Sequence, residues 1–600
     1  MRNIAVWILA LGVAAAPALA ADGPGSGTDN GKPAANSATT KNSAAPATNT
    51  TDAKSGDTAK KASVEEELDE LRAVLRDQAA RLAEQQQEID NMKAELSHSH
   101  SDGSAAPAAT VAASAPAATP SGSSAASTSS APATGSPTLV AKSTEAPRQS
   151  SSGSEGPASI SFKGVTLTPG GFFAAESVWR QRALSADINT PFNSVPFAGS
   201  SQSQISEFNA SGRQSRISML VEGKVGIAKL SGYYETDFLS AGVTSNSNQS
   251  NSYTLRQRQF WAQAALDSGW TFTGGQMWSL VTERKSGLSN RTEAPPLTID
   301  AQYSIGFSWA RQYAFRVTKE FNKKAWLGIA VENPQTTLTA HANNNNFLIG
   351  AAGANGGLLP TVNNFSFNKT PDVVVKMAFE PGFGHYEVFG VYSDFRARIF
   401  PGTPPSVVGA FNDSRNAGGV GANARMPIVA KKLDFGVHAF VGDGIGRYGT
   451  GGLSDVTVRP NGTLAPLRAG QGLVTLEAHP TPAWDVYFNY GMEYVARGAY
   501  TIGAAGEGYG SPLFANTGCG IETLPGNNTT PGGLGACTGD TKSLQEGTAG
   551  IWYRFYRGSY GTLAMGLQYS YVVRNAWSGV GGSPHNNENM VFTSFRYYIP

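Results

Sequence analysis

The chain has 600 residues and a formal net charge of +1, with 15% charged and 10% aromatic residues. This length excludes a single small domain, and so low a charged fraction is unusual for a soluble protein of this size. The near-neutral total conceals two parts of opposite sign, because residues 1–156 carry 12 Lys and Arg against 17 Asp and Glu, whereas residues 157–600 carry 34 against 28, a balance of +6. We expect no nucleic acid among the partners.

Residues 1–20 have the three parts of a secretory signal peptide. Arg2 supplies the positive start, and Ile4–Ala16 is an apolar run too short to cross a membrane as a helix. Ala18-Leu19-Ala20 provides a small-residue cleavage site. The pattern predicts that the mature chain leaves the cytoplasm.

Two linkers and a coiled coil are predicted next. Residues 21–60 and 101–156 are rich in Ala, Ser, Thr and Pro and have few large apolar residues, so we expect both to be disordered. Between them, residues 61–100 repeat apolar side chains on a seven-residue frame, which favours a periplasmic coiled coil over a lone amphipathic helix. The predicted core positions include Leu68, Leu71, Leu75, Leu82, Ile89, Met92 and Leu96.

Residues 157–600 show short segments with a period of two. In Thr562–Arg574 large apolar and aromatic residues alternate with small and polar ones, and Leu433–Val441 and Val373–Phe379 repeat the pattern. Such alternation is typical of a membrane strand with one lipid face and one lumen face. We therefore predict an all-β transmembrane β-barrel of 16 strands, possibly 18, in preference to a soluble sandwich or propeller.

The connections between these segments are of two kinds. Pro381–Gly384 and Arg557–Gly561 are predicted to be short periplasmic turns, since outer-membrane barrels have short turns on one side and long loops on the other. The predicted extracellular loops are 335–370, 400–418, 444–470 and 500–545.

The two cysteines, Cys519 and Cys537, lie in one Gly-, Asn-, Thr- and Pro-rich stretch. In an exported chain this indicates a loop disulfide. No further metal ligands lie near them, so neither a metal site nor any other cofactor is expected.

Three segments resemble Gram-negative trimeric porins. Gly275–Leu280 is similar to the Gly-Gln-x-Trp-Ser segment of that group, and Arg216–Ser218 through Gly232–Leu239 and Leu255–Trp261 resemble its early strands. A coiled coil before the barrel is similar to DcaP-like porins, so the resemblance implies a homotrimer with a periplasmic helical extension. The chain ends on Tyr597-Tyr598-Ile599-Pro600 where such porins usually end on an aromatic residue, and no segment matches their inward-folded constriction loop.

Strand alternation proposes which charges line the pore. Arg256 and Arg258 share one face of their predicted strand, and Glu235 and Asp237 share one face of a different strand. If the two pairs face each other, they would set a transverse field across the pore. The alternative is that each arginine lies near the rim and binds lipopolysaccharide phosphates. The predicted pore-lining residues are Arg216, Glu235, Asp237, Arg256, Arg258, Lys376, Asp394, Arg396, Arg398, His438 and Arg554.

Three functions remain open at this point. The first is passive diffusion of small polar solutes through an outer-membrane porin, with a weak preference for anionic, carboxylate-type solutes. The second is a structural protein whose coiled coil spaces the barrel from the cell wall. The third, a barrel hydrolase, needs a histidine beside a nucleophile, and the histidines of residues 157–600 are isolated in sequence, so we do not expect an enzyme.

Overall fold

The computed structural model describes residues 159–240, 253–341, 368–401, 406–522 and 536–600. The predicted signal peptide, both linkers and the coiled-coil positions lie outside the described residues. Among those that are described, no helix is both long and apolar enough to cross a lipid bilayer.

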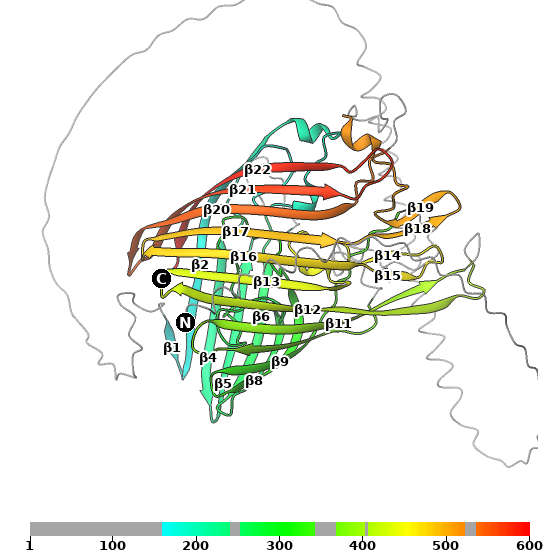
Figure 1. Cartoon of the computed structure of the whole chain (residues 1–600). Helices are drawn as coiled ribbons and strands as arrows, with labels where there is room; N and C mark the ends of the chain where they lie inside the picture. The colour runs from blue at the N-terminus through cyan, green and yellow to red at the C-terminus, as the bar shows by residue number, and fades with distance from the viewer. Residues whose placement is uncertain (1–158, 241–252, 342–367, 402–405, 523–535) are drawn as a thin grey trace, which may run out of the picture. The chain divides into compact units, whose positions relative to one another are not determined.

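Sixteen long antiparallel strands form one closed sheet (Figure 1), which confirms the predicted barrel and the lower of the two strand counts. Each strand pairs with its neighbour in the chain. The strands are β2 (Val165–Arg180), β4 (Arg216–Val225), β5 (Ala228–Asp237), β6 (Arg256–Leu266), β7 (Trp270–Trp278), β8 (Arg311–Phe321), β9 (Ala325–Glu332), β10 (Asp372–Phe379), β11 (His385–Ile399), β12 (Phe411–Val429), β13 (Leu433–Asp443), β16 (Arg468–Thr481), β17 (Trp484–Val495), β20 (Thr541–Gly558), β21 (Gly561–Ala576) and β22 (His585–Tyr598).

Strand β2 closes the barrel. Its second half pairs with β22, from Phe172↔Tyr598 to Arg180↔Met590, while its first half pairs with β4. The short β3 (Glu207–Ser211) continues β4 along the same side of β2, and β1 (Ile160–Phe162) forms a hairpin with its start. Gly171 has φ +128, and a Cβ there would lie 2.1 Å from the carbonyl oxygen of Arg216. Glycine is therefore required where β2 lies against the start of β4.

The two ends of the barrel have different connections. At one end, together with β1 and the C-terminus, the strands are joined by turns of two to five residues (Figure 1). At the other end they are joined by segments of eight to 45 residues, two of which contain small hairpins, β14 (Val456–Val458) with β15 (Leu464–Pro466) and β18 (Gly498–Ile502) with β19 (Ala505–Tyr509). The two turns predicted from the sequence are present. The predicted loop 400–418 is shorter than expected, because β12 already begins at Phe411.

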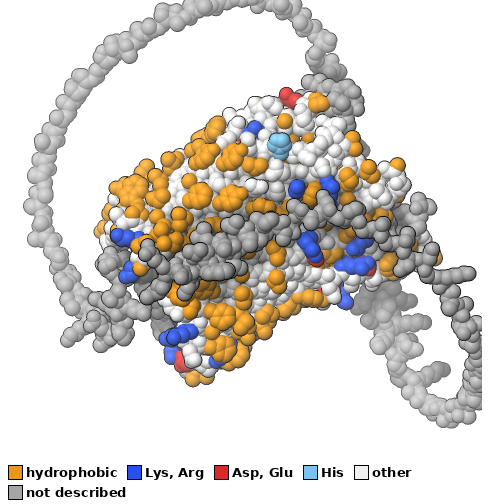
Figure 2. Space-filling view, viewed as in Figure 1, with side chains coloured by type: hydrophobic (Ala, Val, Ile, Leu, Met, Phe, Trp, Pro, Cys, Tyr) orange, Lys and Arg blue, Asp and Glu red, His pale blue; other side chains and the backbone are white. Residues whose placement is uncertain are grey.

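Strand alternation separates an apolar outer face from a polar inner one. On β21, Leu567 and Tyr569 are 50% and 47% exposed, whereas Gln568 and Ser570 between them are buried. Figure 2 shows hydrophobic side chains gathered over the outer wall, with Lys and Arg towards its two ends. A band of this kind suits contact with lipid, and it leaves the polar positions for the lumen.

Candidate functional site: a loop across the lumen and an arginine cluster

The segment 279–310, which connects β7 to β8, folds into the barrel. We call it the inward loop. Four of its apolar side chains are at most 1% exposed, namely Leu280, Ile299, Ile305 and Phe307. They are buried even though the strands of the opposite wall are remote from them in the sequence. The sequence analysis did not find this loop. The available signal was its start at Gly275–Leu280, the segment that resembles trimeric porins.

Hydrogen bonds fasten the inward loop to the far wall. The backbone N–H of Ile305 donates to the Glu546 carboxylate at 2.8 Å, and that of Gly306 donates to the Glu493 carboxylate at 2.9 Å. The contact is close, because a Cβ at Gly491 of β17 would lie 1.7 Å from the carbonyl oxygen of Ile305. These side chains supply the acceptors that a buried loop backbone needs.

A second loop also fills part of the lumen. Ile188, Phe192 and Val195, from the segment 181–206, are buried in the same apolar cluster as Ile299 and Ile305 of the inward loop. This cluster continues into side chains of β17, β20, β21 and β22. The open cross-section is therefore much narrower than the barrel itself.

Lys376 and His438 were predicted to line the pore, and both do point inward. They are nevertheless buried, because the inward loop covers them. The Lys376 ammonium donates to the Thr282 carbonyl at 2.9 Å and to Glu387 at 2.8 Å, and His438 bonds to the Ser308 hydroxyl at 3.0 Å. Both residues hold the loop against the wall and do not face the solute path.

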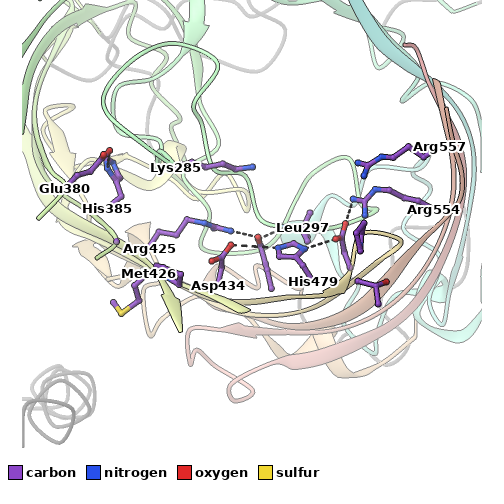
Figure 3. A pocket seen from close by; sticks show the side chains of 16 residues that line it. Lys285, Leu297, Glu380, His385, Arg425, Met426, Asp434, His479, Arg554 and Arg557 are labelled. Carbon is purple, nitrogen blue, oxygen red and sulfur yellow. Dashed lines mark hydrogen bonds and ion pairs between the residues drawn. The ribbon is translucent and has the colours of Figure 1, made fainter. Parts of the chain in front are cut away.

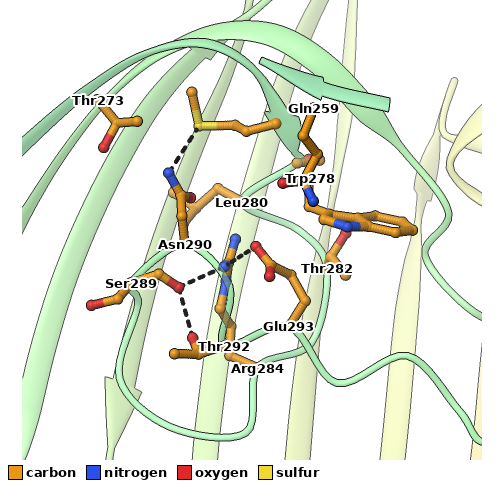
Figure 4. A network of polar contacts seen from close by, with 12 residues as sticks. Gln259, Thr273, Trp278, Leu280, Thr282, Arg284, Ser289, Asn290, Thr292 and Glu293 are labelled. Carbon is orange, nitrogen blue, oxygen red and sulfur yellow. Dashed lines mark hydrogen bonds and ion pairs between the residues drawn. The ribbon is translucent and has the colours of Figure 1, made fainter. Parts of the chain in front are cut away.

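The first turn of the inward loop carries its own polar network (Figure 4). The buried Arg284 pairs with Glu293 at 2.6 Å and also donates to the Ser289 carbonyl. Burial, together with nearby Glu387, raises the pKa of the Glu283 carboxyl to about 8, against the opposing effect of Arg425. Glu283 is therefore mainly protonated at neutral pH.

Five arginines and two carboxylates meet at one side of the lumen, and we call them the arginine cluster. Arg258 is 2% exposed and donates to Glu235 at 2.8 Å and to Asp237 at 2.6 Å. Arg256 forms a two-bond pair with Asp237 at 2.8 and 2.9 Å, and Arg216 lies 3.8 Å from Glu235. The predicted field across the pore is thus wrong in its geometry, because Asp237 and Arg256 are cross-strand neighbours on β5 and β6.

Arg291 and Arg311 complete the arginine cluster, and the sequence analysis did not select either. Arg291 lies in the inward loop over the Tyr233 ring at 5.0 Å, and Arg311 lies over the indoles of Trp278 and Trp309 at 4.9 and 4.7 Å. Among the described residues, neither guanidinium has a carboxylate within ion-pair distance. Their positions, one in a loop and one at a strand start, have no alternation signal.

The electrostatic balance of the arginine cluster is positive, with five guanidinium groups against the carboxylates of Glu235 and Asp237. The pKa of Tyr303, in the inward loop, reflects this positive balance. Its hydroxyl accepts a hydrogen bond from Arg258 at 3.3 Å. Burial alone would raise the pKa of Tyr303, but Arg258, Arg216 and Arg311 lower it below its ordinary value. An anionic group is therefore favoured beside this side of the inward loop.

Three predicted pore residues lie elsewhere. Phe395, Ala397 and Ile399 of β11 are buried in one cluster with the β14–β15 hairpin. Alternation then turns Asp394, Arg396 and Arg398 to the opposite face of this strand, away from the lumen. Assigning these three to the pore was incorrect.

Arg554 lines the lumen near the short turns. It pairs with Asp485 at the wall of a cavity of about 630 Å³ (Figure 3). The cavity contains four cationic and four acidic side chains besides two histidines. They are Lys285, Arg425, Arg554, Arg557, Glu380, Asp434, Glu477, Asp485, His385 and His479. Its charges balance, so the cavity adds width and polarity to the path but little preference for one sign of charge.

At the long-loop end, Cys519 and Cys537 are joined in a disulfide. Within the described ranges, no group of three or more His, Cys, Asp or Glu residues is placed to hold a metal ion.

A closed barrel of 16 strands, with long loops at one end and loop segments folded into the lumen, is the architecture of an outer-membrane porin. The crystal structure of the outer membrane channel DcaP of Acinetobacter baumannii has a TM-score of 0.51 with this chain at 16% identity, and the match covers 74% of this chain and 100% of that one. At that identity the likeness concerns the fold.

Two further solved structures match with lower scores. An anion-selective porin from Comamonas acidovorans has a TM-score of 0.38 at 10% identity, covering 72% of this chain and 100% of that one. OmpF of Salmonella typhi, in complex with daunomycin, has a TM-score of 0.40 at 11% identity, covering 73% of this chain and 100% of that one. No protein-family model and no curated protein matches the sequence.

Proposed function

We propose that this chain is an outer-membrane porin for passive diffusion of small polar solutes, and that it prefers anions, including carboxylates. The observation that carries the preference is the arginine cluster beside the inward loop, where Arg291 and Arg311 have no carboxylate partner. Fixed charges in a narrow wet passage act strongly on passing ions, because the surrounding protein screens them poorly. The basic excess of residues 157–600 supports the same sign.

Bilayer recordings test both parts of this proposal. Purified, folded protein should insert into a planar bilayer with stepwise conductance, and a KCl gradient should give a reversal potential of anion sign. In the variant R291Q/R311Q that potential should fall by about half, because both unpaired guanidinium groups are lost.

The matched control is R396Q/R398Q, which removes the same charge from the outward face of β11 and should leave the reversal potential unchanged. A silent bilayer with correctly folded protein would contradict the porin. Stepwise conductance without anion preference, or with equal effects of the two double variants, would contradict only the anion preference.

We further propose that the chain is a homotrimer in the outer membrane, contacting lipid and lipopolysaccharide outside and carrying residues 61–100 as a coiled coil in the periplasm. The heptad pattern runs from Val64 to Leu96. These about 33 helical residues would reach roughly 50 Å at a rise of ~1.5 Å each, which suits a spacer that contacts the cell wall.

Deletion of residues 61–100 tests whether the coiled coil stabilises the trimer or only spaces the barrel from the cell wall. If the coiled coil stabilises the trimer, the deleted protein should dissociate at a lower temperature in semi-native electrophoresis, with its conductance per barrel unchanged. Trimers of unchanged thermal stability would leave the segment with a spacing role alone.

A further inference from the structure

Three cations lie at the long-loop ends of the neighbouring strands β16, β17 and β20. Arg468 is the first residue of β16, Arg497 follows the end of β17, and Lys542 is at the start of β20. All three side chains are exposed. Arg497 directly follows Ala496, whose N–H donates to the carbonyl of Arg468 at 2.7 Å.

Trp577, which follows β21, contacts both Arg497 and Lys542. The Arg497 guanidinium lies 4.5 Å from the centroid of its indole ring, and the Lys542 ammonium lies 4.9 Å from the same centroid. Arg497 also donates to the Ser578 carbonyl at 2.9 Å, which fixes its position. Two cations are thus held on one ring, where each repels the other.

Within the described residues, the charge of this group is compensated only in part. Arg468 pairs with Asp443 at 3.0 Å, but among the described residues no carboxylate forms an ion pair with Arg497 or Lys542. An exposed like-charge pair costs stability unless an anion neutralises it. Guanidinium groups are especially suited to phosphate, which they bind with paired, charge-assisted hydrogen bonds.

The surface directly below these cations suits an acyl chain. The outward side of β16 continues from Arg468 through Gly470 and Gly472, and these glycines are flanked by exposed Val441 on β13 and Met492 on β17. Apolar side chains of the lipid-facing wall therefore begin next to Arg468. Figure 2 shows Lys and Arg side chains at this end of the wall, beyond the hydrophobic band.

We propose that Arg468, Arg497 and Lys542, with Trp577 as their support, bind the phosphate groups of a phosphorylated glycolipid of the outer leaflet, whose acyl chains lie along the β13–β17 wall. This inference rests on the proposed placement in the outer membrane, because that placement brings the long-loop end to the level of the outer-leaflet head groups. It assigns a defined lipid site to the barrel exterior, separate from the solute path.

Native mass spectrometry of the detergent-solubilised full chain tests the site, with bis-phosphorylated lipid A as the probe. The variant R497Q/K542Q should lower the bound fraction by about tenfold or more, since two charge-assisted contacts to phosphate are lost. The matched control K323Q/K324Q removes the same charge from a short turn at the other end and should bind like the unaltered chain. Lipid A without phosphates should bind weakly to all three proteins.

Several outcomes would overturn the proposal. They are equal binding by R497Q/K542Q and its control, equal binding of lipid A with and without phosphates, displacement of lipid A by inorganic phosphate at comparable concentration, and a change of oligomer number in R497Q/K542Q that would mark the patch as a contact between copies. Conductance of the same preparations in a planar bilayer keeps this test apart from the porin proposal. Conducting barrels with unaltered lipid binding in R497Q/K542Q refute the lipid site alone, whereas folded barrels that bind lipid A but never conduct refute the porin alone.

Discussion

Replacing the inward loop with a tight turn should raise the single-channel conductance several-fold. The replacement is sterically simple, because Trp278 and Arg311 are paired in register and the N–H of Ser279 donates to the carbonyl of Ala310 at 2.9 Å. Residues 281–308 can therefore give way to a short Gly-containing hairpin turn. Ion current through a wet pore rises with the open cross-section, and this segment occupies much of it.

The wall should tolerate this deletion. Glu493, Glu546 and Gln568 lose the loop N–H groups that they accept, but water entering the wider lumen can replace those donors. The control is E283Q, which keeps the loop and mimics a carboxyl that is mainly protonated at neutral pH, so its conductance should be that of the unaltered chain. An unchanged conductance after deletion would assign the constriction to the segment 181–206 instead.

The barrel wall was predictable from sequence because its rule is local. A strand such as Thr562–Arg574 shows its two faces through alternation alone, and a turn such as Pro381–Gly384 shows itself through residues that are unsuited to strands. Both features depend on side chains within a few positions of each other. The strand number, 16 or possibly 18, followed from the length of residues 157–600 and their several long loops.

The inward loop was not predictable in this way, because its partners are remote. Ile305 and Gly306 are held by Glu546 and Glu493, which lie 241 and 187 residues further along the chain. Nothing in the local pattern shows that these carboxylates accept loop N–H groups. For the same reason the inward direction of Lys376 was predicted correctly, whereas its burial under the loop was not.

The error at Arg396 and Arg398 has a different physical cause. Alternation divides a strand into two faces, but it does not say which of them is turned inward. On most strands the apolar face meets lipid, so polar residues were assigned to the lumen. At this end of β11 the β14–β15 hairpin covers Phe395 and Ile399, so the apolar face is the inner one and the arginines are outside.

Removing the buried guanidinium of Arg258 should cost about 3–5 kcal/mol of unfolding free energy, because Glu235 and Asp237 would stay buried with only the more exposed Arg216 and Arg256 as counter-charges. Glu235 and Asp237 are 6% and 0% exposed, so water cannot readily solvate them in place. The variant R258M, which keeps the approximate length of the side chain, should unfold at a clearly lower urea concentration in lipid vesicles. The fluorescence change that accompanies barrel unfolding gives the midpoint.

Arg256 provides the matched comparison, because it pairs with the same Asp237 but its side chain is 28% exposed. R256M should therefore cost only about 1 kcal/mol. The triple variant E235Q/D237N/R258M also removes the two buried carboxylate charges that lost Arg258, and it should recover most of the stability lost in R258M. Equal midpoints for R258M and R256M, or no recovery in the triple variant, would show that the arginine cluster is open to water in the folded barrel and that its charges are screened. The anion preference would then have to come from Arg291 and Arg311 alone.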